Sequence, residues 1–186
     1  AGSRHSEINI LMPILLNFIK LMSKKYNDIT YVFHSTKELN HIIQSYIKNC
    51  SLSNCEVISD DKFKAHLLRK SIFAIAKSGT VSLEICNAKI PSVIIYKMNF
   101  INFLIVKMLV KIKYANIINI AAKEEIIPEL LQSNCNSENI FKVVSNFLDT
   151  PSMLQEQVEK TQKILIELKS VESSAELASK AINGRL

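Results

Sequence analysis

The chain has 186 residues, of which 48% are hydrophobic and 22% charged, a composition typical of a globular domain and not of a disordered chain. Its 23 basic and 17 acidic residues give a net charge of +6, which suits an anionic ligand or a membrane surface. Because no basic run is interleaved with aromatic residues and tryptophan is absent, we expect no nucleic-acid partner.

The four cysteines and four histidines do not form a metal-binding pattern. No CxxC pair and no HExxH motif occurs, so we predict no metal site and no cofactor, with the cysteines as reduced, mostly buried thiols. No signal peptide is visible, and no uninterrupted apolar run reaches the roughly 18 residues that span a bilayer. Since the chain begins at Ala1 and not at Met, we expect it to be a fragment.

The first predicted element is a helix. Apolar residues recur at helical spacing from Ile8 to Met22, and Pro13 is expected to kink this helix. Arg4 precedes the helix, where a guanidinium can pair bidentately with phosphate. A solvated turn residue is the alternative interpretation of Arg4.

Strands and helices then alternate. Residues 29–33 are typical of a strand, and Ser35 with Glu38 predicts a capping box that opens a helix ending near Asn49. A short strand and a further helix, capped by Asp60, follow at residues 56–58 and 60–69.

The next segment predicts one βαβ unit. It has apolar strands at 72–76 and 92–96, a helix at 81–88 and a turn at Ser78-Gly79-Thr80. Small residues where a helix N-terminus meets the carboxyl end of a sheet favour phosphate, although a simple turn with a helix cap fits equally well. Glu84 lies one turn into the helix, where it could accept hydrogen bonds from a ribose diol or simply favour the helix dipole.

This order of elements predicts an α/β fold, a Rossmann-like doubly wound parallel sheet with flanking helices. We assign it to residues 1–150, followed by a helical extension at 151–186 that begins at Thr150-Pro151. Of this extension we expect an amphipathic helix that packs on the domain.

From Phe100 to Val110 only Asn102 and Lys107 are polar, so apolar residues surround a helix here. The segment is either a fully buried helix or one that faces an anionic membrane surface. In the second case the membrane-facing residues are Phe100, Phe103, Leu104, Lys107 and Lys111.

Residues 114–132 are predicted to form a loop, followed by a short helix that Pro128 begins. Asn119 stands between isoleucines, and a buried amide there either ties down the loop or contacts a ligand. Glu129 and Gln132 would share one face of the short helix. Another helix is expected at 136–148.

Five segments in this order resemble the C-terminal half of lipid-A-disaccharide synthases. They are GSRHSEI at 2–8, SGTVSLE at 78–84, IPSVIIYKMN at 90–99, VKIKYANIIN at 110–119 and IPELLQ at 127–132. Each motif is weak alone, but five at fitting spacing are specific. The final helices match only in character.

The resemblance implies the UDP-binding half of an inverting, metal-independent GT-B glycosyltransferase. That family transfers 2,3-diacylglucosamine from its UDP donor to 2,3-diacylglucosamine 1-phosphate, a lipid acceptor, and releases UDP. By resemblance, Arg4 and Ser78-Gly79-Thr80 would hold the diphosphate and Glu84 the ribose. Three further residues would line the donor cleft, namely Asn119, Glu129 and Gln132.

The resemblance also implies that the general base and an N-terminal half-domain lie outside this chain, which would be cytoplasmic and peripheral on the inner face of the bacterial inner membrane. Lys77 and Ile72 depart from the family pattern, and Lys77 could add phosphate affinity or lie in solvent. Two rivals stay open. One is another UDP-GlcNAc-type enzyme, either a 2-epimerase or the glucosaminyltransferase of peptidoglycan synthesis, and the other is a non-catalytic membrane-surface module.

Overall fold

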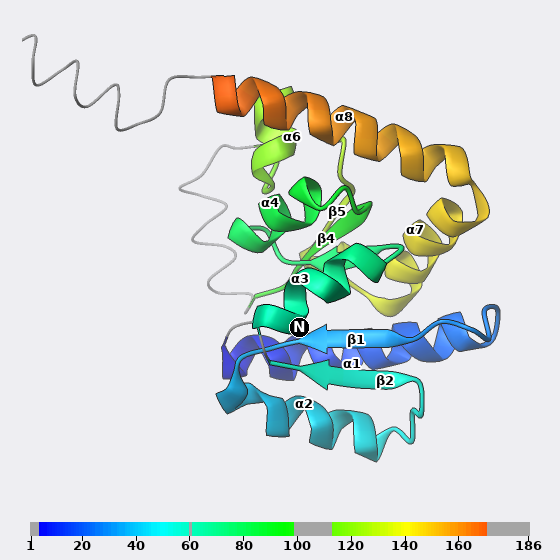
Figure 1. Ribbon diagram of the computed structural model, residues 1–186. Coiled ribbons are helices and arrows are strands. Elements are labelled where there is room, and N and C mark those ends of the chain that lie inside the picture. The colour runs from blue at the N-terminus through cyan, green and yellow to red at the C-terminus, as the bar shows by residue number, and fades with distance from the viewer. Residues whose placement is uncertain (1–3, 60, 99–112, 171–186) are drawn as a thin grey trace, which may run out of the picture.

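The computed structural model describes residues 4–59, 61–98 and 113–170. Helices and strands alternate along the chain, as the sequence predicts (Figure 1). In chain order they are α1 His5–Ser23, β1 Tyr31–His34, α2 Lys37–Asn49, β2 Cys55–Ile58, α3 Asp61–Lys70, β3 Ala74–Ala76, α4 Thr80–Asn87, β4 Ser92–Tyr96, α6 Ile117–Ala122, β5 Glu129–Leu131, the 3-10 helix η1 Gln132–Asn134, α7 Ser137–Asp149 and α8 Pro151–Ser170.

All pairs of neighbouring strands in the described residues are parallel, which confirms the predicted class of fold. Strand β1 pairs with β2, and a second sheet has the order β3-β4-β5. We expected one continuous sheet, whereas here β1 and β3 are not hydrogen-bonded to each other. Each of these two strands therefore keeps one hydrogen-bonding edge that no strand of the described chain occupies.

Helices cover both faces of the second sheet. Successive side chains of β4 point to opposite sides, so each face of this strand packs against a different set of helices. Val93 and Ile95 pack into a core cluster with α1, α2 and α7, whereas Ile94 packs into a second cluster with α4, α6 and α8. Figure 1 shows this division, with α1 and α2 on one side of the molecule and α8 along the other. Apolar runs buried on both faces are what the sequence of β4 predicts.

Helix α1 supplies much of the first cluster and continues through Pro13. Eight of its side chains are buried: Ile8, Leu11, Met12, Leu15, Leu16, Phe18, Ile19 and Met22. Within the described residues, helix α1 has the length and the apolar composition that a membrane-spanning helix needs. Its buried stripe is equally that of a core helix, so this finding is weak support for a span.

Two local predictions were wrong. The capping box does not form, since α2 begins after Thr36, without a side-chain cap, and the amide of Ser35 donates to the carbonyl of Ile58 at 3.0 Å. Ser35 therefore extends the β1–β2 ladder. Pro128 does not begin a helix either, because its carbonyl accepts from the amide of Ile94 at 2.9 Å and leads into β5.

The helical extension that begins at Pro151 is tied to the sheet by polar contacts. The buried amide of Gln157 accepts from the backbone of Ser92 at 2.6 Å and donates to the carbonyls of Ser92 and Ile126 at 3.1 and 3.2 Å. Gln162 donates to the carbonyl of Cys86 at 2.6 Å. Helix α8 thus packs on the domain, as the sequence predicts. It also supplies hydrogen-bond partners for the backbone of Ser92, the first residue of β4.

Candidate functional site

The turn between β3 and α4 has a backbone that favours glycine. Gly79 caps α4 with φ 143° and ψ −163°, a region that residues with a Cβ rarely adopt. A Cβ built at Gly79 would meet no atom within 4 Å, so the constraint is conformational and not steric. Gly79 and Thr80 are exposed, which leaves the first turn of α4 accessible to a ligand.

Side-chain hydrogen bonds fix the conformation of this turn on its buried side. Ser78 Oγ donates to the carbonyl of Ala115 at 2.6 Å, and Ser82 Oγ donates to the carbonyl of Gly79 at 2.7 Å. Ser82 also accepts from Asn116 Nδ2 at 3.1 Å. The turn is thus held in one shape by residues that leave its outer side open, the preorganisation that an anion site requires.

Glu84 lies one helical turn beyond this opening. Its carboxylate forms an ion pair with Lys64 of α3, and its side chain is 46% exposed while that of Lys64 is 19% exposed. The sequence did not single out Lys64, because a lysine in an amphipathic helix carries no signal of its own. The pair places one acidic and one basic group beside the exposed turn.

Asn119 and Glu129 lie at the centre of a saturated network. Asn119 Oδ1 accepts from the amides of Ile126 and Ile127, both at 2.9 Å, and its Nδ2 donates to the Ile127 carbonyl at 2.7 Å and to Glu129 Oε1 at 2.8 Å. Glu129 also accepts from the amides of Ala115 at 2.7 Å and Asn116 at 2.9 Å.

This network ties down residues 115–129, from just before α6 to the start of β5, which is one of the two roles that the sequence suggested for Asn119. The side chain is fully buried and makes every hydrogen bond that an amide can make. A direct contact of Asn119 or Glu129 with a ligand stays a prediction. Asn116 was missed, although an asparagine before a short apolar run is a typical helix cap, and it caps α6 through Ile118 at 2.9 Å.

Gln132 does not share a helix face with Glu129, because Glu129 begins β5 and Gln132 begins η1. Gln132 has φ 52° and accepts from the amide of Met98 at 3.4 Å, just beyond the carboxyl end of β4. The two side chains therefore belong to different elements, with Glu129 in register with Ile94 of β4 and Gln132 bonded beyond the end of that strand.

Arg4 is the exposed N-cap of α1, and its carbonyl accepts from the amides of Glu7 and Ile8, both at 3.1 Å. Glu7 Oε1 accepts from Lys77 Nζ at 2.5 Å, and Lys77 Nζ lies 5.3 Å from the ring centroid of Tyr96. Lys77 thus does not extend into solvent. The contact joins the beginning of α1 to the residue immediately before the Ser78-Gly79-Thr80 turn.

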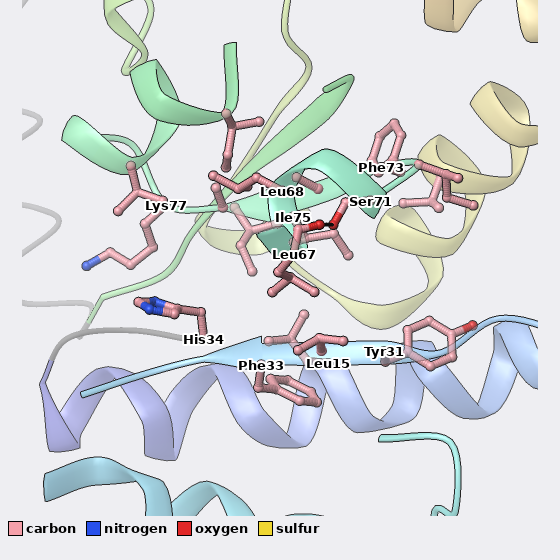
Figure 2. Close-up of a pocket in the computed structure, with 18 of the residues that line it drawn as sticks. Leu15, Tyr31, Phe33, His34, Leu67, Leu68, Ser71, Phe73, Ile75 and Lys77 are labelled. Atoms are coloured by element: carbon pink, nitrogen blue, oxygen red, sulfur yellow. Dashed lines mark hydrogen bonds between the residues drawn. The ribbon is translucent and has the colours of Figure 1, made fainter. Parts of the chain in front are cut away.

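A cavity of 890 Å³ lies between β1 and β3. Figure 2 shows Lys77 and His34 at one end and Tyr31 and Phe73 towards the other, with apolar side chains between them. Its walls include the two unpaired strand edges, whose backbone groups an alkyl chain cannot satisfy. We therefore do not assign the cavity to an acyl chain.

The other predicted sites contribute less. Phe100, Phe103, Leu104, Lys107 and Lys111, predicted to face a membrane, lie outside the described residues, as does the predicted cap Asp60. In the described ranges no three histidine, cysteine or acidic side chains gather as metal ligands. Burial raises the pKa of Cys86 to about 11, which favours the unreactive thiol.

Comparison with known proteins identifies relatives along almost the whole chain. A family profile described as lipid-A-disaccharide synthetase matches residues 1–182. Two proteins named lipid-A-disaccharide synthase, from Rickettsia prowazekii (strain Madrid E) and Sulfurihydrogenibium sp. (strain YO3AOP1), are 38% and 32% identical over 97% and 90% of this chain. The chain covers 48% and 44% of these proteins, so it spans about half the length of the curated relatives it matches.

Two solved structures share the fold at low sequence identity. The C-terminal domain of a glycosyl transferase group 1 family protein from Francisella tularensis matches with a TM-score of 0.60 at 11% identity, over 91% of this chain and 83% of that one. A candidate UDP-N-acetylglucosamine 2-epimerase from Listeria monocytogenes gives 0.59 at 15% identity, over 90% of this chain and 42% of that one. These likenesses show the fold alone.

Proposed function

Because the chain belongs to the lipid-A-disaccharide synthetase family, we propose that it binds the UDP-linked sugar donor of a glycosyltransferase. Its fold is that of the C-terminal, Rossmann-like half of GT-B glycosyltransferases. In the proposed reaction, 2,3-diacylglucosamine passes from UDP to the lipid acceptor 2,3-diacylglucosamine 1-phosphate with inversion at the anomeric carbon. The products are lipid A disaccharide 1-phosphate and UDP.

The observation that carries this proposal is the exposed glycine turn at the N-terminus of α4. The first amides of a helix have no partner within the helix, and together with the dipole of α4 they suit a diphosphate, which becomes more negative as UDP departs. Glu84 is one turn further along and half exposed, at a place where a carboxylate could accept hydrogen bonds from the ribose diol. Arg4 would add a guanidinium to the leaving diphosphate.

Lys64 fits this reaction as the partner of Glu84. When the ribose hydroxyls donate to the carboxylate, the ion pair with the ammonium holds the carboxylate in one orientation. The general base that takes the proton of the acceptor hydroxyl would come from the half of the relatives that this chain does not cover. We therefore expect the 186-residue chain alone to bind UDP without turnover. We place the complete reaction at the cytoplasmic surface of the bacterial inner membrane, where the lipid acceptor would lie.

The test is UDP binding measured by calorimetry at low salt on the wild type and on Glu84→Ala. We expect saturable binding that the substitution weakens at least about tenfold, or about 1.4 kcal/mol. Glu156→Ala is the matched control, because Glu156 is an exposed glutamate of α8 that also pairs with a lysine. No UDP binding by a folded wild type, or equal binding by Glu84→Ala, would contradict the proposal.

A second measurement separates this function from the other UDP-sugar enzymes. Combined with an N-terminal half-domain from a relative, the chain should use the 2,3-diacylated donor and not UDP-N-acetylglucosamine. Turnover of the unacylated donor would favour an epimerase or a peptidoglycan glucosaminyltransferase. Vesicle binding that ignores both UDP and Glu84→Ala would favour the non-catalytic membrane module.

A further inference from the structure

We propose that Glu7 and Lys77 are positioning residues that hold Arg4 beside the Ser78-Gly79-Thr80 turn. This inference rests on the proposed function, because it assigns the pair a part in binding the donor diphosphate. We call the ion pair the Glu7–Lys77 clasp. Neither residue is proposed to touch the donor.

The clasp joins two segments that are 70 residues apart in the sequence. Glu7 lies in the first turn of α1, and its amide is bonded to the carbonyl of Arg4. Lys77 follows the last residue of β3 and precedes Ser78 directly. Fixing Glu7 against Lys77 therefore fixes the backbone of Arg4 relative to the turn.

The sheet does not provide this link by itself. Strand β1, which follows α1, is not paired with β3, and the cavity of 890 Å³ separates the two strands. Lys77 lies at one end of that cavity (Figure 2). Its ion pair with Glu7 is a direct polar contact between α1 and the β3–α4 turn. The clasp therefore adds a polar link beside the site to the apolar contacts that α1 makes with β4.

The surroundings of Lys77 favour a positioning role over direct phosphate binding. The side chains of Lys77 and Glu7 are only 24% and 17% exposed, so the pair is shielded from solvent. The ammonium also lies over the ring of Tyr96 at 5.3 Å. Because the ammonium of Lys77 is already paired with a carboxylate and lies over a ring, its charge is not available as a separate partner for a phosphate.

The two roles give opposite results for Glu7→Gln. If Lys77 bound phosphate directly, removing the carboxylate would release its ammonium and UDP would bind more tightly. With a clasp, the same change releases Arg4 and UDP binds more weakly. Calorimetry with UDP should show a loss of about fivefold for Glu7→Gln and for Lys77→Met, whereas Lys77→Arg keeps the pair and should stay within about twofold of wild type.

A double-substitution cycle tests whether the clasp acts through Arg4. In the wild type, Arg4→Ala should weaken UDP binding about tenfold, as expected for loss of a charge-assisted hydrogen bond. In the Glu7→Gln background the same change should cost less than about twofold, because Arg4 is no longer held in place. A merely structural pair would leave the effect of Arg4→Ala unchanged.

Glu156→Gln is the control, since it removes an exposed ion pair on α8. Circular dichroism and thermal melting check that every variant is folded, and Glu7→Gln preserves the shape of the side chain. Wild-type binding with an equal or tighter affinity for Glu7→Gln, or additive effects in the cycle, would overturn the clasp alone. Absence of UDP binding by the folded wild type would overturn the proposed function as well.

Discussion

Two regions beside the sheet differ in how their polar groups are used. In the Ser78-Gly79-Thr80 turn, Gly79 and Thr80 are exposed, and the first amides of a helix such as α4 have no partner within the helix. Around Asn119, every polar atom of the side chain is bonded to the protein, and the residue is fully buried. The first region has exposed groups that can contact a ligand, whereas the side-chain amide of Asn119 already makes all four of its hydrogen bonds within the protein.

The difference teaches that neighbouring motifs can serve one site in different ways. Ser78 and Ser82 connect the two regions, through the carbonyl of Ala115 and the amide of Asn116. The network thus supports the turn from behind. Substitutions in the network should therefore lower stability first, and substitutions in the turn should lower binding first.

The largest expected effect is that of Asn119→Ala on stability. The change leaves the buried amides of Ile126 and Ile127 without partners and removes one donor to Glu129. We expect the free energy of unfolding to fall by about 3 kcal/mol or more, because each unsatisfied buried group costs about 1–3 kcal/mol. Urea unfolding followed by circular dichroism measures this loss.

Asn146→Ala is the matched control, since Asn146 is an exposed asparagine of α7 and should change stability by less than about 0.5 kcal/mol. If Asn119→Ala were as stable as this control and lost UDP binding instead, the network would be a ligand site and the division between the two regions would be wrong.

The strand–turn–helix–strand unit could be predicted from the sequence because its signals are local. The apolar run of β4 and the Ser-Gly-Thr turn determine those elements with little help from distant residues, and β4 has the predicted bounds, Ser92–Tyr96. The exposed, glycine-capped turn follows from the same pattern. Local sequence therefore predicted the open side of the candidate site.

For the supporting network the sequence suggested that Asn119 ties down a loop, but its bonding partners could not be predicted, because they come from tertiary contacts. Residues 114–132 combine Asn116, Asn119 and Glu129 with isoleucines, and the partners of these polar groups lie up to 34 residues away. Pro128 suggested a helix start, but pairing with β4 made the following residues a strand. The ion pairs of Lys64 and Lys77 likewise depend on elements that only the fold brings together.

Gly79→Ala should have an intermediate effect on stability and a clear one on binding. At φ 143° an alanine is strained even though its Cβ meets no neighbour, which costs about 1–3 kcal/mol. The turn can relieve that strain only by changing shape, so UDP binding should weaken in the folded protein. Calorimetry at a temperature well below the melting point separates the two effects, and unchanged binding would contradict a role for the backbone of the turn.

The smallest expected effect lies outside both regions, where Lys25 pairs with Asp149 and Tyr26 donates to Asp149 at 2.7 Å. Hydrogen bonds from Lys25 and Tyr26 lower the pKa of Asp149 below its usual 3.8, while the same pair raises the pKa of Lys25 above its usual 10.5. The unfolded chain therefore holds the Asp149 proton more tightly. The stabilisation is complete above the unfolded pKa of this carboxyl and is lost as the pH falls through the lowered folded value.

At alkaline pH the sign reverses for Lys25, whose contribution is complete below its unfolded pKa and lost as the pH rises through the raised folded value. Asp149→Asn should remove both parts of the pH dependence while leaving UDP binding unchanged. Both side chains are nearly half exposed, and the pair lies just beyond the C-terminus of α1, at the opposite end of that helix from Arg4. Urea midpoints measured from acid to alkaline pH report the first effect and calorimetry the second. A loss of UDP binding in Asp149→Asn would show that distant surface changes also weaken binding. Loss of binding in a turn variant would then no longer identify the turn as the binding site.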